Sequence, residues 1–214
     1  MPRPRNLPDT VVLDRAVDLF WRNGYAATSL RDLTEATGLS TAALYHRFVD
    51  KDGLFVAVLC RYADEGLNDR LARLAALTAP LEAIRCFLDE IIALSLEDRD
   101  RRGCLLVNTA LDGAAMSDTA RQTVRARFSE VEAFFARCLR RAVADGTLDR
   151  DTSIDTAATA LLGAVFAIRV MARLDPDAGR LRGLASHAMA SLPGGQATIP
   201  APVPATLAKT GECV

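Results

Sequence analysis

One short segment, STAALYHRF at residues 40–48, can place four small or aromatic side chains together on the surface of a helix. Ser40 can cap such a helix at its N-terminus. Leu44 and Phe48 lie one turn apart, so we expect both to face the protein interior. The side chains that remain on the exposed face are Thr41, Ala42, Tyr45 and His46.

The chemistry that suits this face is the recognition of duplex DNA. A helix of this size fits the major groove, where small side chains allow the backbone to approach the base edges. The Thr41 hydroxyl can bond a base edge or a phosphate, and Ala42 can contact a thymine methyl group. Tyr45 and His46 can reach the sugar-phosphate backbone. The segment therefore predicts double-stranded DNA as a partner.

Most of the binding strength would come from phosphate contacts on neighbouring elements. A helix N-terminus presents free N–H groups and a positive dipole end to a phosphate, and such ends are predicted at Thr28 or Ser29 and at Lys51. Arg3 and Arg5 could reach along the DNA backbone or into a minor groove. The predicted DNA-binding residues are Thr28, Ser29, Arg31, Ser40, Thr41, Ala42, Tyr45, His46 and Lys51.

Candidate catalytic and metal-binding residues are few. The chain has two histidines, His46 and His187, and no nucleophile, base and orienting acid follow a recognisable pattern. It has no Gly-rich phosphate loop and no metal-ligand spacing. We therefore expect no enzyme activity, no metal and no cofactor. A thiol enzyme that pairs Cys104 with His187 is the conceivable exception.

The cysteines indicate reduced thiols. The chain has five of them, an odd number without a C-x-x-C pair, which fits a cytosol better than a disulfide framework. Cys104 follows Arg101 and Arg102 at a predicted helix start, where positive charge and the helix dipole would favour a thiolate. Two interpretations stay open: a reactive sensor of oxidants or electrophiles, or a small buried packing residue.

Apolar spacing predicts that helices alone position these residues. Asp9 or Thr10 can cap a first helix, and Asn23 with Gly24 can end it. Gly38 gives the backbone freedom for a tight turn between the second and third helices, as in a helix-turn-helix. The predicted helices cover residues 9–23, 29–37, 40–50, 51–77, 80–96, 104–113, 117–145, 152–174 and 176–191. No strand pattern is present, so the predicted fold class is all-α.

The composition supports a folded protein and argues against several other classes. The chain has 214 residues, half of them hydrophobic and a quarter charged, which suffices for a sizeable core. A net charge of −1 excludes a polycation that coats nucleic acid. The N-terminus lacks the apolar run of a signal peptide. The longest apolar stretch, residues 160–168, is shorter than the ~20 residues of a membrane span, so we expect a cytoplasmic protein without a membrane partner.

Residues 12–58 resemble the DNA-binding domain of TetR-type transcriptional regulators. The motifs that carry this resemblance are A-x-x-L-F at 16–20, GY at 24–25, TS at 28–29, GLS at 38–40, LYHRF at 44–48 and KDGL at 51–54. Thr34 replaces the alanine usual in the family, and Asp52 with Gly53 replaces the usual glutamate and alanine or aspartate. The resemblance implies an all-α homodimer whose C-terminal body binds a small-molecule effector and controls binding to a palindromic operator, most often as a repressor.

The domain prediction follows from this organisation. Residues 1–52 would form the DNA-binding domain with a basic arm, and residues 53–192 the effector-binding and dimerisation domain. Residues 193–214 are Pro-rich and predict a disordered tail. An effector pocket should be mostly apolar with a few polar groups. The predicted pocket residues are Tyr62, Phe87, Ile91, Cys104, Val107, Asn108, Asp112, Phe128, Phe135, Phe166 and Arg169.

A helix rich in small residues at 152–174 can approach another helix closely. Together with the last helix and their symmetry mates it could form a four-helix interface. The spacing alone also allows packing within one chain, and the family resemblance favours the dimer. The predicted interface residues are Ala157, Ala160, Gly163, Ala164, Ala167, Leu181, Leu184 and Ala188.

One further class of function competes with a regulator. A helical ligand-binding protein could retain the DNA-binding shape without the activity, and the nearly balanced charge of residues 1–51 is the best argument for it. The two can be separated because DNA binding through phosphates weakens steeply with salt.

Overall fold

The computed structural model describes residues 7–77, 79–113 and 116–193, and in these ranges it contains helices and no strand. The all-α prediction is confirmed. Arg3, Arg5 and residues 194–214 of the predicted tail at 193–214 lie outside the described residues. The elements are α1 (Asp9–Ala27), α2 (Leu30–Thr37), α3 (Thr41–Phe48), α4 (Lys51–Ala63), η1 (Asp64–Asn68), α5 (Asp69–Ala75), α6 (Pro80–Glu97), α7 (Leu105–Leu111), α8 (Asp118–Ala144), α9 (Ile154–Leu174) and α10 (Ala178–Ala190).

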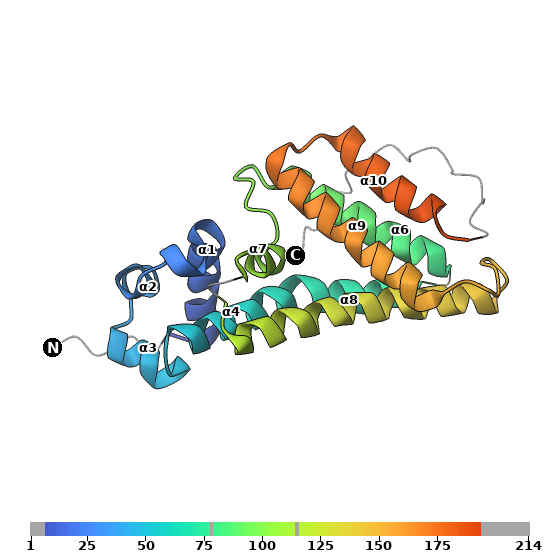
Figure 1. Cartoon of the computed structure of the whole chain (residues 1–214). Helices are drawn as coiled ribbons and strands as arrows, with labels where there is room; N and C mark the ends of the chain where they lie inside the picture. Colours follow the sequence, from blue (N-terminus) through green and yellow to red (C-terminus); the bar gives the residue numbers. More distant parts are fainter. Residues whose placement is uncertain (1–6, 78, 114–115, 194–214) are drawn as a thin grey trace, which may run out of the picture.

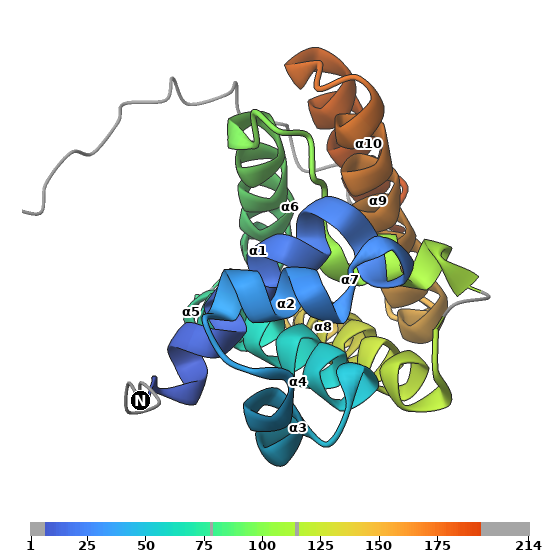
Figure 2. The ribbon, with the colours of Figure 1, turned by 90° about the vertical axis from the view of Figure 1, so that its left-hand side faces the viewer.

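The helices form two groups that α4 and α8 connect. Figure 1 shows α1, α2 and α3 at one end of the molecule, and α6, α9 and α10 stacked together toward the other end. The helix α7 lies between the groups. Turned to face the viewer in Figure 2, α1, α2 and α3 cover one end of the body.

Local capping explains why α2 and α3 are short and sharply bounded. The Ser29 N–H donates to Asp32 Oδ2 at 2.8 Å, and the Asp32 N–H donates to Ser29 Oγ at 3.2 Å. This reciprocal capping box starts α2. Gly38, at φ +72°, ends it, and Ser40 Oγ accepts the Ala43 N–H at 3.2 Å to start α3. The predicted helix-turn-helix is therefore present.

The junction between α3 and α4 is tight and strained. Val49 has φ +69° and ψ −58°, and the Asp50 N–H donates to the Phe48 carbonyl at 2.8 Å, which is a γ-turn of the rare positive-φ kind. Asp50 then caps α4 by accepting the Gly53 N–H at 2.7 Å. A Cβ atom at Gly53 would lie 2.1 Å from the Phe48 carbonyl oxygen, so the close approach requires glycine.

The single helix predicted for residues 51–77 is interrupted by a π-helical turn at Asp64–Asn68 and ends with α5 at Ala75. Four apolar residues spaced four apart line one side of this stretch. Three of them, Leu59, Ala63 and Leu67, are buried, and Leu71 is partly buried. A spacing of four exceeds the 3.6 residues of an α turn, so a wider turn keeps all four on the same side.

Two hydrophobic cores sit side by side. The N-terminal core consists of Val12, Ala16, Phe20, Leu33, Leu39, Leu44, Leu54, Phe55, Val58, Leu59, Ala63, Leu105, Leu106, Ala120 and Val124. The C-terminal core is built from buried residues of η1, α5, α6, α8, α9 and α10 with the loop residue Leu148 and with Leu192. Phe128 of α8 packs against both cores. The N-terminal core extends past residue 52 into α4, α7 and α8, so α1–α3 share one hydrophobic core with these helices.

The helix α9 is, by length and composition alone, long and apolar enough to cross a membrane. It is longer than the nine-residue apolar stretch read from the sequence. Core helices of globular proteins meet the same description, and α9 packs against α6, α8 and α10.

Candidate functional site

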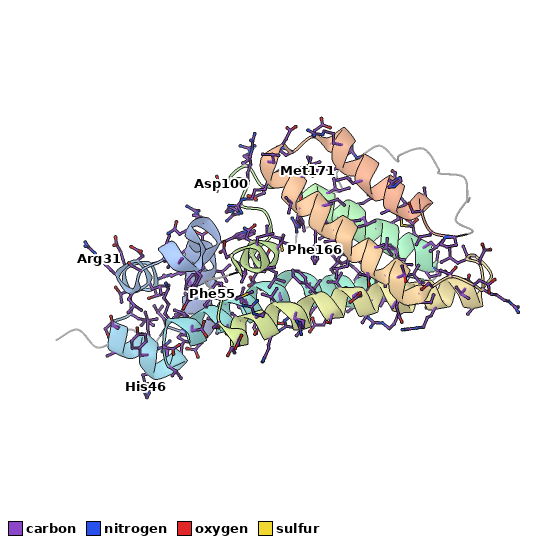
Figure 3. The ribbon with its side chains drawn as sticks, viewed as in Figure 1. Arg31, His46, Phe55, Asp100, Phe166 and Met171 are labelled. Atoms are coloured by element: carbon purple, nitrogen blue, oxygen red, sulfur yellow. The ribbon has the colours of Figure 1, made fainter. Side chains whose placement is uncertain are left out.

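The predicted recognition face of α3 is exposed. Leu44 is buried in the N-terminal core, with 1% of its surface exposed, whereas Tyr45 exposes 36%. Thr41, Ala42 and His46 are exposed as well. Figure 3 shows His46 pointing away from the body at the outer edge of α3. The structure therefore brings the four residues together on one accessible surface.

The N-terminus of α2, the helix that precedes α3, is exposed as well. Ser29 and Arg31 are exposed, and Arg31 projects outward in Figure 3. The Ser29 hydroxyl donates to Asp32 at 2.7 Å, and the hydrogen bonds from Ser29 lower the pKa of the Asp32 carboxyl. The structure corrects the predicted DNA contact of Thr28, because the side chain is completely buried and its hydroxyl donates to the Gly24 carbonyl at 2.7 Å. That hydroxyl is not available to DNA.

Lys51 has a structural partner at the start of α4. Its Nζ donates to the Tyr25 carbonyl at 2.7 Å and lies 4.3 Å from the centre of the Tyr25 ring. Burial lowers the pKa of the Lys51 ammonium. The contact ties the start of α4 to the last turn of α1. A phosphate contact by Lys51 stays a prediction.

Two residues near the recognition face were missed by sequence reasoning. Arg47 Nη1 donates to the Leu7 carbonyl at 2.8 Å and pairs with Asp9 at 2.9 Å, so it fixes the point where the chain enters α1. Arg47 lies in the LYHRF motif, which was a usable signal. Val49 exposes 79% of its surface beside α3. Nothing in the pattern indicated this, because valine usually marks a core position.

Part of the predicted effector pocket assembles where the two cores meet. Tyr62 and Cys104 pack against the N-terminal core and Phe166 packs against the C-terminal core. The Phe128 and Phe166 rings contact each other edge-on at 4.7 Å. The pKa of the Tyr62 phenol is raised by burial and by the neighbouring Cys104 thiol, while Arg169 acts in the opposite direction. We call Tyr62, Cys104, Phe128, Phe166 and Arg169 the junction cluster.

Other predicted pocket residues lie elsewhere. Phe87, Ile91 and Phe135 are buried in the C-terminal core, where the rings of Phe87 and Phe135 contact each other at 5.1 Å. The structure corrects the pocket prediction for these three residues, because their side chains fill the core and leave no surface for a ligand. Asp112 is exposed at the end of α7, outside the junction cluster. Spacing on separate helices could not show which apolar faces close on one another.

The α7 candidates differ in how they are engaged. Val107 is buried. The Asn108 amide accepts from Arg173 at 2.9 Å and donates to the Arg102 carbonyl at 2.7 Å, so it holds α7 to α9. A surface hollow of about 420 Å³ lies elsewhere, between η1, α5 and α8, and none of its lining residues was predicted for the pocket. They are Asn68, Leu71, Ala126, Ser129, Glu130, Ala133 and Arg137.

The predicted dimer residues are mostly accessible. Ala160 and Gly163 are exposed, and Ala157, Ala164, Ala167, Leu184 and Ala188 are partly buried. The structure corrects the dimer prediction for Leu181, because this residue is completely buried in the C-terminal core and cannot contact a partner. Val170 and Leu174 were not predicted, although they expose 43% and 74% and continue the three-and-four spacing of Ala160, Gly163 and Ala167. Together these five form an accessible stripe on α9.

Known proteins share both halves of this architecture. Residues 12–58 match the family model described as "Bacterial regulatory proteins, tetR family", and residues 80–188 match "Tetracyclin repressor-like, C-terminal domain". The HTH-type transcriptional repressor ComR of Escherichia coli (strain K12) is 35% identical over 131 residues, which are 61% of this chain and 62% of ComR. The HTH-type transcriptional regulator YezE of Bacillus subtilis (strain 168) is 28% identical over 85% of this chain and 94% of YezE.

A solved structure resembles the whole fold. The TetR family transcriptional regulator CifR, in a cysteine-substituted form with 26-base-pair operator DNA, is 33% identical with a TM-score of 0.80. The match covers 89% of this chain and 100% of CifR. The exposed α3 face, the two matching domains and this likeness together identify the molecule. The chain belongs to the TetR family of DNA-binding transcriptional regulators, and its family is one of regulators rather than enzymes.

Proposed function

We propose that this regulator is a homodimeric repressor that binds a palindromic operator and leaves it when a small effector binds the body. The observation that carries this proposal is the accessible α3 face, with Thr41, Ala42, Tyr45 and His46 standing on a buried Leu44. In the major groove the small side chains let the helix approach the base edges. Because its proposed partner is operator DNA, we expect the protein in the cytoplasm.

The phosphate contacts would surround this helix. The exposed Ser29 and Arg31 lie at the start of α2, and Ser40 lies at the start of α3. A helix start offers N–H groups without intrahelical partners. Lys51 would add a charge at the start of α4. We retain residue 52 as the functional boundary: residues 1–52 read DNA, and residues 53–192 bind effector and partner, followed by the tail at 193–214.

The stripe on α9, together with α10, is the proposed contact between protomers. Apart from the adjacent residues and the backbone of α9 itself, no atom of the described residues lies within 4 Å of the position that a Cβ of Gly163 would occupy, so a partner helix can approach it closely. The exposed Leu174 and Val170 supply apolar area. A two-fold axis here would have to place the two α3 helices about 34–36 Å apart, or a multiple of that, to read successive grooves. Leu174→Glu should therefore shift the protein from dimer to monomer in light-scattering measurements.

The junction cluster is the proposed effector site. It lies where the N-terminal core meets the C-terminal core, so a ligand there would alter how α1–α3 rest on the body. Such a ligand changes DNA affinity only to the extent that it binds the two arrangements differently.

The test is binding to a duplex from upstream of the protein's own gene, measured by fluorescence anisotropy at several salt concentrations. A repressor of this kind should lose affinity steeply with salt, because each neutralised phosphate releases counterions. Lys51→Met should flatten the slope by about one unit if Lys51 contacts a phosphate. Binding that ignores salt and sequence alike would contradict the proposal.

A second candidate is a repressor that responds to electrophiles through Cys104. The observation that favours it is the partial exposure of Cys104 beside Tyr62 in the junction cluster. Operator affinity that falls after treatment with an electrophile, and does not fall in Cys104→Ser, would support thiol sensing. Unchanged affinity of the treated wild type would exclude it.

A further inference from the structure

Arg169 is a buried cation, and it has no acidic partner among the described residues. It exposes 9% of its surface, and its Nη1 donates to Ser95 Oγ at 3.0 Å. Across residues 7–77, 79–113 and 116–193, no carboxylate forms an ion pair with its guanidinium. Its electrostatic neighbour from α4 is the Tyr62 phenol, whose pKa is raised by burial.

Other partly buried arginines of this protein are paired. Arg70 meets Glu90 at 3.0 Å, Arg127 meets Asp64 at 3.1 Å, and Arg102 meets Asp98 at 3.2 Å. The side chains of these three arginines are 14%, 17% and 25% exposed, whereas Arg169 exposes 9% of its residue surface. A buried charge is costly unless an opposite charge or several hydrogen bonds compensate it. Among the residues that the structure describes, the Ser95 hydroxyl is the hydrogen-bond partner of Arg169, so no opposite charge compensates the guanidinium there.

The side chains around Arg169 can complete a site for an anion. The Ser95 hydroxyl donates its proton to the Ile91 carbonyl at 2.7 Å and accepts from Arg169, so it orients the guanidinium. Tyr62 carries a hydroxyl and the neighbouring Cys104 a thiol, and both of these groups can donate hydrogen bonds. Phe166 lies three residues before Arg169 on the same helix, and its ring contacts Phe128. Figure 3 shows Phe166 on the side of α9 that faces α8. A charged end and an aromatic end therefore lie one helical turn apart.

We propose that Arg169 binds the carboxylate of the effector, and that the effector is a small organic acid whose apolar part packs against Phe166 and Phe128. This inference rests on the proposed effector control and names the ligand class of that site. The planar guanidinium can hold a carboxylate through two parallel hydrogen bonds. A single arginine matches the single negative charge of a carboxylate better than the larger charge of a phosphate.

The probes for the test are 3-phenylpropanoate and its uncharged amide, titrated into the full-length protein by calorimetry. The two molecules share the aromatic ring and differ in charge. We expect the carboxylate to bind about tenfold tighter or better, since hydrogen bonds to charged groups contribute more than neutral ones. Arg169→Gln should remove this preference. Arg173→Gln, one turn further along α9 and exposed, is the matched control and should retain it.

Three results would overturn the proposal: equal binding of the two probes, a carboxylate preference that survives in Arg169→Gln, or no binding of the carboxylate at millimolar concentration. Should Arg169→Gln fail to fold, Ser95→Ala takes its place. That variant removes the hydrogen bond that orients Arg169 and should weaken the carboxylate several-fold while leaving the amide unchanged. Equal weakening of the two probes in Ser95→Ala would count against the proposal.

Operator binding in the presence of each probe separates this inference from the proposed function. Release by the carboxylate and not by the amide supports both. Carboxylate binding at Arg169 without release leaves the anion site standing and overturns effector control through it. Release by the amide alone supports effector control and overturns the anion site.

Discussion

The indole of Trp21 and the phenol ring of Tyr62 meet edge-on, with ring centroids 5.0 Å apart. Trp21 belongs to α1 and Tyr62 to α4, so the contact joins the DNA-reading end to the junction cluster. Arg102 lies 4.1 Å from the indole centre and pairs with Asp18 of α1 at 3.2 Å. These contacts therefore join α1 to the junction cluster and to the loop that precedes α7.

This connection predicts energetic coupling between Trp21 and Tyr62. Trp21→Leu and Tyr62→Leu should each lower the free energy of unfolding, and the double variant should lose less than their sum. We expect a coupling of about 0.5–1.5 kcal/mol, the range for aromatic pairs. Denaturant titration of the four proteins gives the value. A matched cycle with Phe87 in place of Tyr62, in the other core, should show additivity.

The recognition face predicts separate effects of removing and adding atoms. Tyr45→Ala should weaken operator binding by about tenfold, because one DNA contact is lost. Ala42→Leu should weaken it too, because the added bulk keeps the helix from the base edges. Both side chains are exposed, so thermal denaturation should show unchanged stability. Intact operator binding in Tyr45→Ala would remove this residue from the contact surface.

The capping box at α2 predicts an acid dependence of stability. Hydrogen bonds from Ser29 lower the pKa of Asp32 below its usual 3.8. A carboxyl whose pKa is lower in the folded state stabilises that state above the unfolded pKa, and the contribution is lost as the pH falls through the folded pKa. Asp32→Asn should therefore be less stable than wild type near neutral pH, and the difference should shrink in acid. Glu35→Gln, also exposed on α2, is the control and should show no such convergence.

The γ-turn at Val49 predicts a substitution that stabilises. A β-branched residue at φ +69° is strained, and glycine adopts this conformation freely. Val49→Gly should raise the free energy of unfolding by about 1 kcal/mol, since relief of strain exceeds the added freedom of the unfolded chain. Gly53→Ala should act in the opposite sense, because its Cβ would overlap the Phe48 carbonyl. Denaturant titration measures both, and a destabilised Val49→Gly would show that the turn is not strained.

Sequence reasoning recovered the parts of the fold that local chemistry determines. The caps at Ser29 and Ser40, the glycine turn at Gly38 and the inward Leu44 are set by residues within one helical turn, and the structure contains all of them. Spacing shows which side of a helix is apolar but not what covers it. For this reason Leu181, placed on a dimer surface, lies inside its own protomer.

The pocket prediction failed in part for the same reason. Phe87 and Phe135 have the residue type of a ligand contact, yet their rings close on each other. Arg169 stood out because it interrupts an apolar stretch, and the structure keeps it buried. The π turn had a readable signal in the four-residue spacing of Leu59, Ala63, Leu67 and Leu71, which differs from the mixed three-and-four spacing of an α-helix.

The π-helical turn at Asp64–Asn68 sets the rotation of the N-terminal helices relative to the C-terminal core about the axis of α4. The helical stretch of residues 51–75 begins in the N-terminal core, directly after α3, and ends in the C-terminal core. Each residue of an α-helix advances the chain by about 100°, so one residue more or fewer at Asp64–Asn68 would swing everything before it around the helix axis by roughly a quarter turn. In the proposed homodimer, the two α3 helices must meet grooves of fixed spacing, so such a rotation would move them out of register with the operator. In that dimer, the length of this five-residue segment would constrain which half-site spacings the protein can bind.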